Sequence, residues 1–246
     1  MKNLVPAGLI CVVILARTAS AQTADELVAR YIKAIGGQAA IDAVTSLRMT
    51  GKYYGGGGFE MLYVQENKRP GKVREESTFQ GLTGVEAYDG STGWKIDPWG
   101  GKKDPESLEE EEMKVIIEDS DIDGPLINYR QKGNTVEYVG MDAVEGTDAY
   151  KLRITMKNGD KEYYYLDTET AMPIKIEIQR MVRGSQKEYE YYPSEFKRVN
   201  GWYLPFSMES NAKGSQDRAK IAYREIEANV PLDDGRFVKP SVEAPR

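Results

Sequence analysis

The sequence has 246 residues, yet it contains no histidine and only one cysteine, Cys11. Without imidazole the chain cannot build a Ser-His-Asp triad, a Cys-His pair or a histidine metal site. Because Cys11 falls within the first 21 residues, we expect it to be removed with a leader, which leaves no thiol and no disulfide. These absences exclude thiol nucleophiles and every chemistry that depends on histidine.

Long apolar runs are also scarce, and the clearest one stands at the N-terminus. Lys2 precedes the apolar stretch Leu9 to Ala16, and Ala19-Ser20-Ala21 has the form of a cleavage site. The stretch is shorter than the about 20 apolar residues that a membrane span needs. Ile10 is not the small residue that lipoprotein processing at Cys11 would require. The pattern predicts a signal peptide over residues 1–21, cleavage after Ala21 and export.

The expected mature chain, from Gln22 onward, is acidic, with 31 basic and 39 acidic residues and a net charge of −8. This balance argues against nucleic acid as a partner. A domain of this length buries about 70 to 75% of its unfolded surface and needs no staple to fold. We expect one domain over residues 22–230, followed by an extended C-terminal tail over residues 231–246, which has prolines and few apolar residues.

The mature chain is expected to begin with one amphipathic helix. Thr23 and Glu26 form a capping box, and apolar residues recur at helical spacing as far as Ile35. Gly36-Gly37 then ends the helix, and residues 39–44 add another turn or two.

From Ser46 onward the apolar period changes from that of a helix to that of a strand. Asn158-Gly159 and Asn200-Gly201 mark tight turns between alternating segments. Gly55 to Gly58 is interpreted as a hairpin tip, because a phosphate loop would lead into a helix and Phe59 to Val64 continues as strand. We count about 11 or 12 strands, which predicts an α+β fold dominated by an antiparallel sheet that curls around its apolar face.

One segment interrupts the strands. Asp104-Pro105-Glu106 has the residues of a helix start and leads through the acidic run Glu109 to Glu112 into an apolar stretch. A break at Asp123-Gly124-Pro125 precedes a second apolar pair. The acidic run is interpreted as a solvated helix face, whereas the apolar residues beside it require a surface to cover.

Other chemistries find less support. Asp119, Asp121 and Asp123 alternate, but they lack the glycine and terminal glutamate of a calcium-binding loop, so no metal site is predicted. A catalytic carboxylate pair is not excluded by composition, although most acids fall on solvent faces or in turns. The 16 tyrosines fit cross-strand pairing, or alternatively the wall of a hydrophobic cavity beneath a mobile lid.

Four short motifs have a joint spacing that resembles the LolA-like family of periplasmic lipoprotein carriers. They are Lys68-Arg69-Pro70, then Tyr88-Asp89-Gly90, then Trp94 and Pro98, with Pro70 and Asp89 nineteen residues apart, Asp89 and Trp94 five, and Trp94 and Pro98 four. The resemblance extends over most of the mature chain. It implies a half-open β-barrel with a helical lid over an apolar cavity that takes acyl chains.

The resemblance also implies roles for single residues. Arg69 would latch the lid by donating hydrogen bonds to lid helices, for which the candidates are Leu27 to Ile35 and Leu108 to Ile127. Trp94 would line or support the cavity. The candidates for the cavity wall as a whole are Met61, Tyr63, Tyr88, Trp94, Trp99, Ile116, Ile117, Leu126 and Ile127.

The expected function is that of a periplasmic, non-enzymatic carrier, without metal or cofactor, that moves the acyl chains of lipoproteins or lipids toward the outer membrane. Its partners would be acylated lipoprotein or lipid and inner- and outer-membrane proteins. The acidic run and the long C-terminal strands depart from the carrier pattern. Two alternatives stay open: an envelope sensor or protein-interaction module on the same fold, and an acid-catalysed enzyme with two close carboxylates of shifted pKa.

Overall fold

A computed structural model describes residues 22–241. The expected signal peptide, its cleavage site after Ala21 and the last five residues lie outside the described part. The helices are α1 (Ala24–Ala34), α2 (Gln38–Asp42) and α3 (Glu110–Ser120), and two 3-10 turns are η1 (Gly56–Gly58) and η2 (Asp234–Arg236). Within the described residues no helix has the length and apolarity needed to cross a membrane.

All strands belong to a single antiparallel sheet of 13 strands. Their order across the sheet is β6-β5-β4-β3-β2-β1-β13-β12-β11-β10-β9-β8-β7. Every pair of neighbouring strands is consecutive in sequence except β1 and β13. Their bounds are β1 (Ser46–Tyr54), β2 (Glu60–Lys68), β3 (Lys72–Phe79), β4 (Leu82–Tyr88), β5 (Gly93–Asp97), β6 (Lys102–Ser107), β7 (Thr135–Val144), β8 (Thr147–Thr155), β9 (Lys161–Asp167), β10 (Pro173–Val182), β11 (Ser185–Val199), β12 (Trp202–Ala212) and β13 (Ala219–Ala228).

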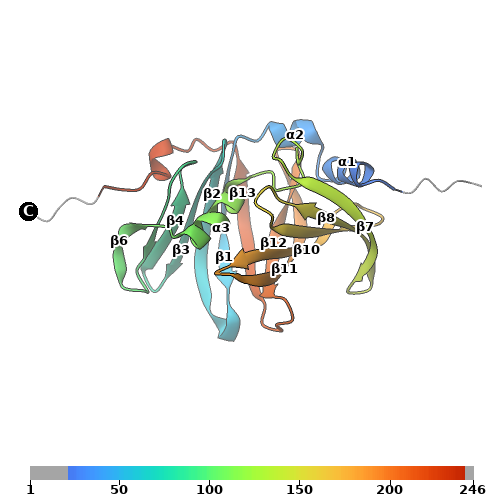
Figure 1. Ribbon diagram of the computed structural model, residues 1–246. Coiled ribbons are helices and arrows are strands. Elements are labelled where there is room, and N and C mark those ends of the chain that lie inside the picture. The colour runs from blue at the N-terminus through green and yellow to red at the C-terminus, as the bar shows by residue number, and fades with distance from the viewer. Residues whose placement is uncertain (1–21, 242–246) are drawn as a thin grey trace, which may run out of the picture.

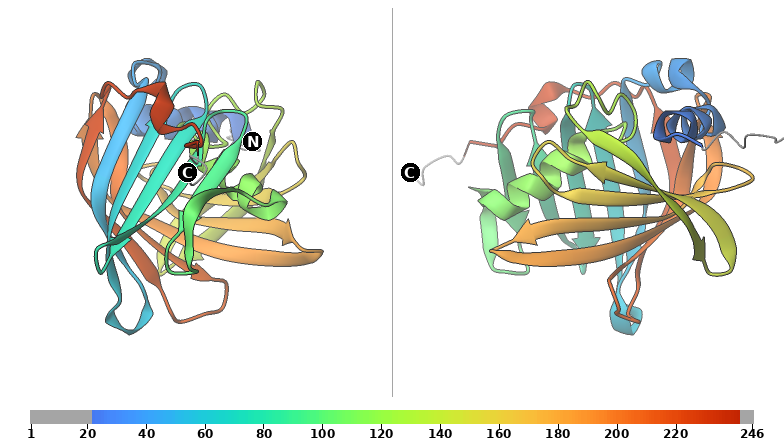
Figure 2. Two further views of the ribbon diagram at one scale, coloured as in Figure 1. Left: turned by 90° about the vertical axis from the view of Figure 1, so that its left-hand side faces the viewer. Right: turned by 45° about the vertical axis from the view of Figure 1, so that its right-hand side comes forward.

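The sheet curls into a half-open barrel, and the helices lie on its concave side (Figures 1 and 2). Helices α1 and α2 cover one end, while α3 crosses the open side in front of the strands. The predicted fold class and lid are confirmed. The strand number is higher than the predicted 11 or 12, partly because β6 replaces part of the predicted helical segment.

Helix α1 forms as the sequence predicts. The Thr23 side chain accepts a hydrogen bond from the backbone of Glu26, and the Glu26 carboxylate accepts one from the Thr23 N–H. Such caps stabilise a helix by about 1 kcal/mol. The apolar face of α1 packs into the main core with α2 and the strands β8, β9, β12 and β13, through residues that include Leu27, Ile35, Ile41, Leu152, Leu166, Trp202 and Ile226.

Helix α3 begins later than the sequence predicts. Residues 102–107, with Asp104 and Pro105, form the edge strand β6, where Lys95 pairs with Glu106 across the ladder. Proline is tolerated there because an edge strand leaves one row of N–H positions unpaired. The helix starts at Glu110 with Glu109 as its cap. Pairing of residues 102–107 with β5 therefore overrides the local preference of Asp104 for a helix start.

A small apolar cluster attaches α3 to the sheet. Leu108 and Ile116 pack on Val73, with Met113 and Tyr88 beside them. A close approach at Gly93 makes this possible, because a Cβ there would lie 2.5 Å from Met113 Sδ and 2.7 Å from Leu108 Cδ1. We call the sheet face that meets α3 the inner face.

The segment expected as an extended tail instead packs on the sheet. Phe237 is fully buried and Leu232 nearly so. The Trp94 indole Nε1–H donates to the Phe237 carbonyl at 2.8 Å, and the Arg74 side chain donates to the Arg236 carbonyl at 3.0 Å. The first part of the expected extended tail is therefore held against the sheet, because an internal tryptophan distant in sequence supplies a partner that local composition does not reveal.

Candidate binding site beneath helix α3

The inner face of the sheet is only partly filled by the helices. In each paired strand, residues opposite one another share a face, so the ladder from Met61 and Tyr53 through Ile221 to Met208 is continuous. These side chains, and Ile178 farther along, are only half-buried. The inner face therefore carries apolar side chains that the protein's own core does not cover.

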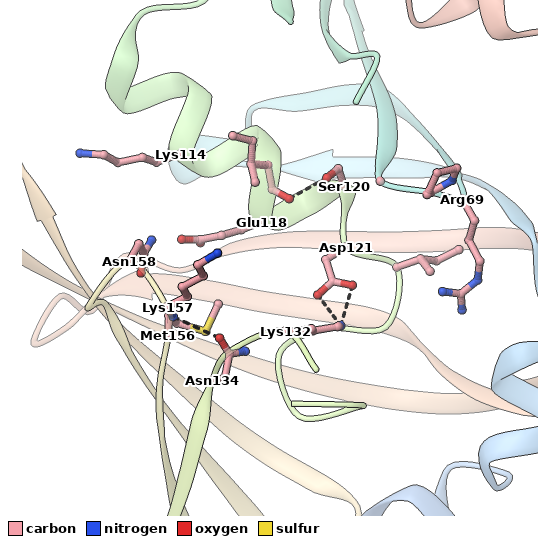
Figure 3. Close-up of a pocket in the computed structure, with 14 residues that line it drawn as sticks. Arg69, Lys114, Glu118, Ser120, Asp121, Lys132, Asn134, Met156, Lys157 and Asn158 are labelled. Atoms are coloured by element: carbon pink, nitrogen blue, oxygen red, sulfur yellow. Dashed lines mark hydrogen bonds and ion pairs between the residues drawn. The ribbon is translucent and has the colours of Figure 1, made fainter. Parts of the chain in front are cut away.

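A pocket of about 860 Å³ opens between α3 and the turns that precede β3, β7 and β9 (Figure 3). Its volume suits a drug-sized or acyl ligand. Apolar side chains make much of its wall and charged side chains stand around it; the lining residues are Arg69, Pro70, Gly71, Lys114, Ile117, Glu118, Ser120, Asp121, Ile122, Lys132, Asn134, Met156, Lys157 and Asn158. We call this space the lid pocket.

The charges around the lid pocket are mostly paired. Lys132 Nζ donates to both carboxylate oxygens of Asp121 and to the Gly124 carbonyl, and Figure 3 shows the Lys132–Asp121 pair beside the C-terminal end of α3. Lys114 lies 3.6 Å from Glu110 and Glu111 on its own helix. Paired charges leave the apolar wall as the feature that a ligand meets.

Arg69 ties the segment after α3 to α2. Its Nη1 donates to Asp123 Oδ2 at 2.7 Å and its Nη2 to Asp123 Oδ1 at 2.5 Å. The same guanidinium donates to the backbone carbonyls of Val44 at 2.7 Å and Ile41 at 3.3 Å. Four contacts from one planar fork fix two separate segments relative to the β2–β3 turn.

Two further ion pairs hold α3 over the barrel. Arg180 on β10 donates to Glu118 Oε2 at 2.7 Å, and both side chains are largely buried, at 9% and 17% exposure. Lys95 on β5 pairs with Glu112 near the start of the helix. The Arg180 Nε–H has no acceptor within residues 22–241. Asn67 on β2 also donates to the backbone carbonyl of Asp119 at 2.7 Å, so the helix is attached to both sides of the open barrel.

The inner face beneath α3 also carries carboxyl groups. Burial raises the pKa of Glu75 on β3 to about 8, and nearby Asp119 raises it further. Burial likewise raises the pKa of Asp119 to about 7, with Glu118 adding to it. On the opposite wall, burial raises the pKa of Glu162 on β9 to about 8, with a contribution from Glu118. The surroundings of these three carboxyl groups therefore favour their protonated, uncharged form.

A second, smaller pocket of about 450 Å³ lies on the inner face near the other end of α3. Trp99 covers Gly84 there, where a Cβ would meet the indole ring at 2.5 Å. The pocket is lined by Glu75, Ser77, Gly84, Val85, Glu86, Lys95, Ile96, Asp97, Trp99 and Glu112, so it is markedly acidic.

Comparisons with known proteins place this architecture. No family model and no curated protein matches the sequence. Among solved structures, a LolA superfamily protein from Nitrosomonas europaea superimposes with a TM-score of 0.59 at 15% identity, covering 89% of this chain and 99% of that one. The fold is LolA-like. A DUF1329 family protein from Desulfovibrio piger gives a TM-score of 0.58 at 12% identity over 89% of this chain and 98% of its own.

A third solved structure, a domain from Vibrio parahaemolyticus described as a putative outer membrane lipoprotein-sorting protein, gives a TM-score of 0.58 at 11% identity, covering 87% of this chain and 97% of that one. At such identities the likeness establishes the fold alone. What the chain binds has to be argued from its own residues.

In this LolA-like half-barrel the sequence-predicted residues divide into groups. Arg69 and Ile117 line the lid pocket, and Trp99 lines the second pocket. Met61 and Tyr63 lie on the inner face of β2. The remaining candidates apart from Trp94 sit in packed apolar clusters: Ile116 on α3 and Tyr88 in the cluster that attaches α3 to the sheet, and Leu126 and Ile127 in the main core.

Trp94 does not face the lid. Since Gly93 meets α3 and successive strand residues point to opposite faces, Trp94 points to the outer side, where Phe237 and Arg74 cover it. Of the two roles that the resemblance implies for Trp94, lining the cavity or supporting it, this geometry leaves only support from the outer side of the sheet as a prediction. Its place is that of a core aromatic beneath the C-terminal segment.

The inner-face acids were not among the predicted site residues. Two of them could have been found from the sequence, because each is two residues from an apolar residue on its strand and so shares its face. Glu75 shares a face with Val73, and Glu162 shares one with Tyr164 and Leu166. A charged residue in an inward register position is unusual enough to mark a site. Asp119 left no such signal, because its helix carries acids on several sides.

Proposed function

We propose that this protein is an exported carrier that holds acyl chains of lipids or lipoproteins beneath α3 and moves them through the periplasm toward the outer membrane. The observation that supports this most is the lid pocket of about 860 Å³, with Ile117, Ile122 and Met156 on its wall, beside an inner face whose apolar side chains are half-buried. An acyl chain that covers this apolar surface would bind favourably, since each CH₂ group removed from water contributes about 0.8 kcal/mol to the free energy of binding.

Release requires that the pocket open, and the attachment of α3 fits that need. The helix rests on one small apolar cluster around Ile116 and on ion pairs such as Arg180–Glu118. Arg69 holds the following segment through Asp123. A few localised contacts can break together, so the closed form can give way to an open form of weaker affinity.

The direct experiment is native mass spectrometry of the mature protein purified from the cell envelope, followed by extraction and identification of bound lipid. We expect bound phospholipid or acylated protein that an added fatty acyl probe displaces. A mass equal to that of the bare chain, with no binding of the probe, would contradict a carrier.

A matched pair of variants locates the site in the same experiment. Ile117→Asp places a charge on the pocket wall, and Val238→Asp places one on a remote segment; their native side chains are 44% and 49% exposed. Because both are exposed, neither change should prevent folding. We expect loss of the co-purifying lipid only in Ile117→Asp.

A sensor or protein-interaction module on the same fold is the second candidate. It is favoured by the packed core that α1, Leu126 and Ile127 fill, which reduces the space available for cargo. A catalytic acid and base pair is less consistent with the inner face, since catalysis needs two groups whose pKa values differ, whereas Glu75, Asp119 and Glu162 are all raised.

A further inference from the structure

The lining of the lid pocket carries more positive than negative charge. Four of its residues are basic and two are acidic, and both acids, Glu118 and Asp121, are bound to a cation. Arg180, which holds Glu118, even keeps an Nε–H without an acceptor within residues 22–241. The acids on the pocket wall are therefore compensated, and the pairing of the basic residues decides which charge a ligand meets.

Two of the four basic residues are fully engaged. Arg69 binds both carboxylate oxygens of Asp123, whose side chain is only 9% exposed, and Lys132 binds both carboxylate oxygens of Asp121. Breaking a shielded pair leaves an uncompensated charge, which is costly. These two cations are therefore not available to a ligand.

Lys157 differs from them because it has no partner. It lies in the turn between β8 and β9, it is exposed, and its ammonium makes no ion pair or hydrogen bond with any of residues 22–241. The nearby Asp160 carboxylate is engaged by the Asn158 side chain at 3.0 Å and the Met181 N–H at 3.3 Å. Figure 3 shows the Lys157 side chain extending from its turn toward α3, which lines the other side of the lid pocket.

Lys114 supplies a second, weakly held ammonium from α3. Within the described chain its ion pairs are with Glu110 and Glu111 on the same helix, each at 3.6 Å. That distance is longer than a charge-assisted hydrogen bond, and the Glu110 side chain is 88% exposed. Exposed pairs of this kind contribute little, so Lys114 can turn to another anion at small cost. The pocket thus presents one unpaired and one weakly paired ammonium.

Apolar side chains adjoin both lysines. Ile117 lies three residues after Lys114 on α3, Met156 precedes Lys157, and all four residues line the same pocket. A ligand can therefore place hydrocarbon on the wall and an anion beside the ammonium groups. Since Lys157 is exposed and the Lys114 side chain is 37% exposed, such an anion keeps part of its hydration and its desolvation costs little.

We propose that the lid pocket binds acyl amphiphiles that carry an anionic head group, either a carboxylate or a phosphate. The head group pairs with Lys157 and Lys114, and the hydrocarbon covers Ile117, Ile122 and Met156. This rests on the proposed function and names the class of cargo. A lysine ammonium acts as a point charge and serves either anion, whereas a cationic head group would meet two like charges.

The test compares amphiphiles with the same tail below their micelle concentrations: laurate, dodecyl phosphate, dodecyl maltoside and dodecyltrimethylammonium, with inorganic phosphate as an anion without a tail. Calorimetry on the mature protein should show laurate, dodecyl phosphate or both binding at least about ten times more tightly than the neutral and cationic amphiphiles. Preference for one of the two anions would support the proposal and identify a fatty acid or a phosphate-bearing lipid as the source.

The contrary outcomes separate this proposal from the carrier. Equal affinity for all four tails would overturn the head-group proposal and leave the carrier standing. Binding of none of them would contradict the carrier itself. Inorganic phosphate that binds as tightly as dodecyl phosphate would overturn the amphiphile, because the tail would then contribute nothing.

Two lysine variants locate the head group. Lys157→Gln removes the unpaired charge from the pocket, and Lys103→Gln removes one from the edge strand β6, where Lys103 is also exposed. Because both positions are exposed, both variants should fold. We expect Lys157→Gln to weaken binding of the preferred anion about tenfold and to leave dodecyl maltoside unchanged, whereas Lys103→Gln changes neither. Equal effects of the two variants would contradict the assignment.

Salt gives a further readout that depends on no variant. Ions screen a pairing between exposed charges, but they do not screen contacts between hydrocarbon and an apolar wall. Raising sodium chloride from about 50 to about 500 mM should therefore lower the affinity for the preferred anion relative to dodecyl maltoside. A ratio of the two affinities that stays constant with salt would overturn the proposal.

Discussion

Arg69 and Asp123 form a two-bond ion pair in which the guanidinium is 29% exposed and the carboxylate 9% exposed. The pair joins the turn after β2 to the segment that follows α3, and the same Arg69 holds the end of α2 through two carbonyls. A single side chain thus connects the covered end of the half-barrel with its lid.

Replacing Arg69 with Leu should loosen that connection. The change leaves the buried Asp123 carboxylate unpaired, and removing one partner of a buried ion pair costs about 3 kcal/mol. We expect faster hydrogen exchange in residues 110–123 and 38–44 and quicker release of bound acyl probe. Unchanged exchange in both segments would contradict the latch.

The control for this change is Arg183→Leu. Arg183 lies 3.9 Å from Glu109, with exposures of 81% and 78%. Exposed pairs contribute between zero and about 1 kcal/mol, so little change in stability is expected. A similar loss in both variants would mean that charge removal in general, rather than the Arg69 contacts, destabilises the lid.

Glu162 makes stability depend on pH. Its folded pKa of about 8 lies above the ordinary value of 4.5, so the folded state holds the proton more tightly than the unfolded chain. The resulting stability is fully present below about pH 4.5 and is lost as the pH rises through about 8. Glu162→Gln should therefore raise the urea midpoint at about pH 9 and change it little at about pH 4.

The exposed Glu169→Gln serves as the comparison for Glu162, since its side chain lies in the turn between β9 and β10. A pH profile that is equally steep in wild type, Glu162→Gln and Glu169→Gln would show that Glu162 is not held protonated by the fold.

Phe237→Ala tests the docking of the C-terminal segment. Phe237 is fully buried, and truncating a buried phenylalanine to alanine lowers the free energy of unfolding by about 3 to 5 kcal/mol. The change should also expose Trp94, whose indole is bonded to the Phe237 carbonyl, and shift its emission to longer wavelength. Val238→Ala, at an exposed neighbouring position, should do neither; a free tail would make the two variants alike.

A methyl group at Gly93 should lift α3. The Cβ would lie 2.5 Å from Met113 Sδ and 2.7 Å from Leu108 Cδ1, so Gly93→Ala forces the helix outward at a cost of about 1 to 3 kcal/mol. Protease cleavage within residues 108–120 reports the displacement. Adding Met113→Ala should restore part of the protection, and failure of that rescue would place the strain elsewhere.

Much of the fold could be predicted from the sequence because local rules agree with tertiary packing. The capping box at Thr23 and Glu26 and the turn at Asn158-Gly159 are local, and each appears where expected. The alternation of Trp202, Leu204 and Phe206 fixes which face of β12 joins the core. Period and turn chemistry are sufficient for these elements.

The errors arose where distant pairing overrides local preference. Asp104 and Pro105 satisfy a helix start, but Lys95 and Glu106 pair as strands. The tail has little apolar content, yet Trp94 and Phe237 meet across 143 positions of sequence. The role of Arg69 in holding the lid segment could be predicted from its motif. That Asp119 lies on the inner face could not be predicted, because it depends on where α3 sits in three dimensions.

The measurement that tests the central claim most directly is photo-crosslinking of a palmitoyl probe with a diazirine near the end of its chain, with the sites mapped by mass spectrometry. A ligand held beneath α3 should label the wall of the lid pocket at Ile117, Ile122 and Met156, and excess unlabelled palmitate should suppress the labelling. Labelling confined to exposed apolar residues of the outer surface, such as Leu62 and Met141, would contradict a binding site beneath the helix.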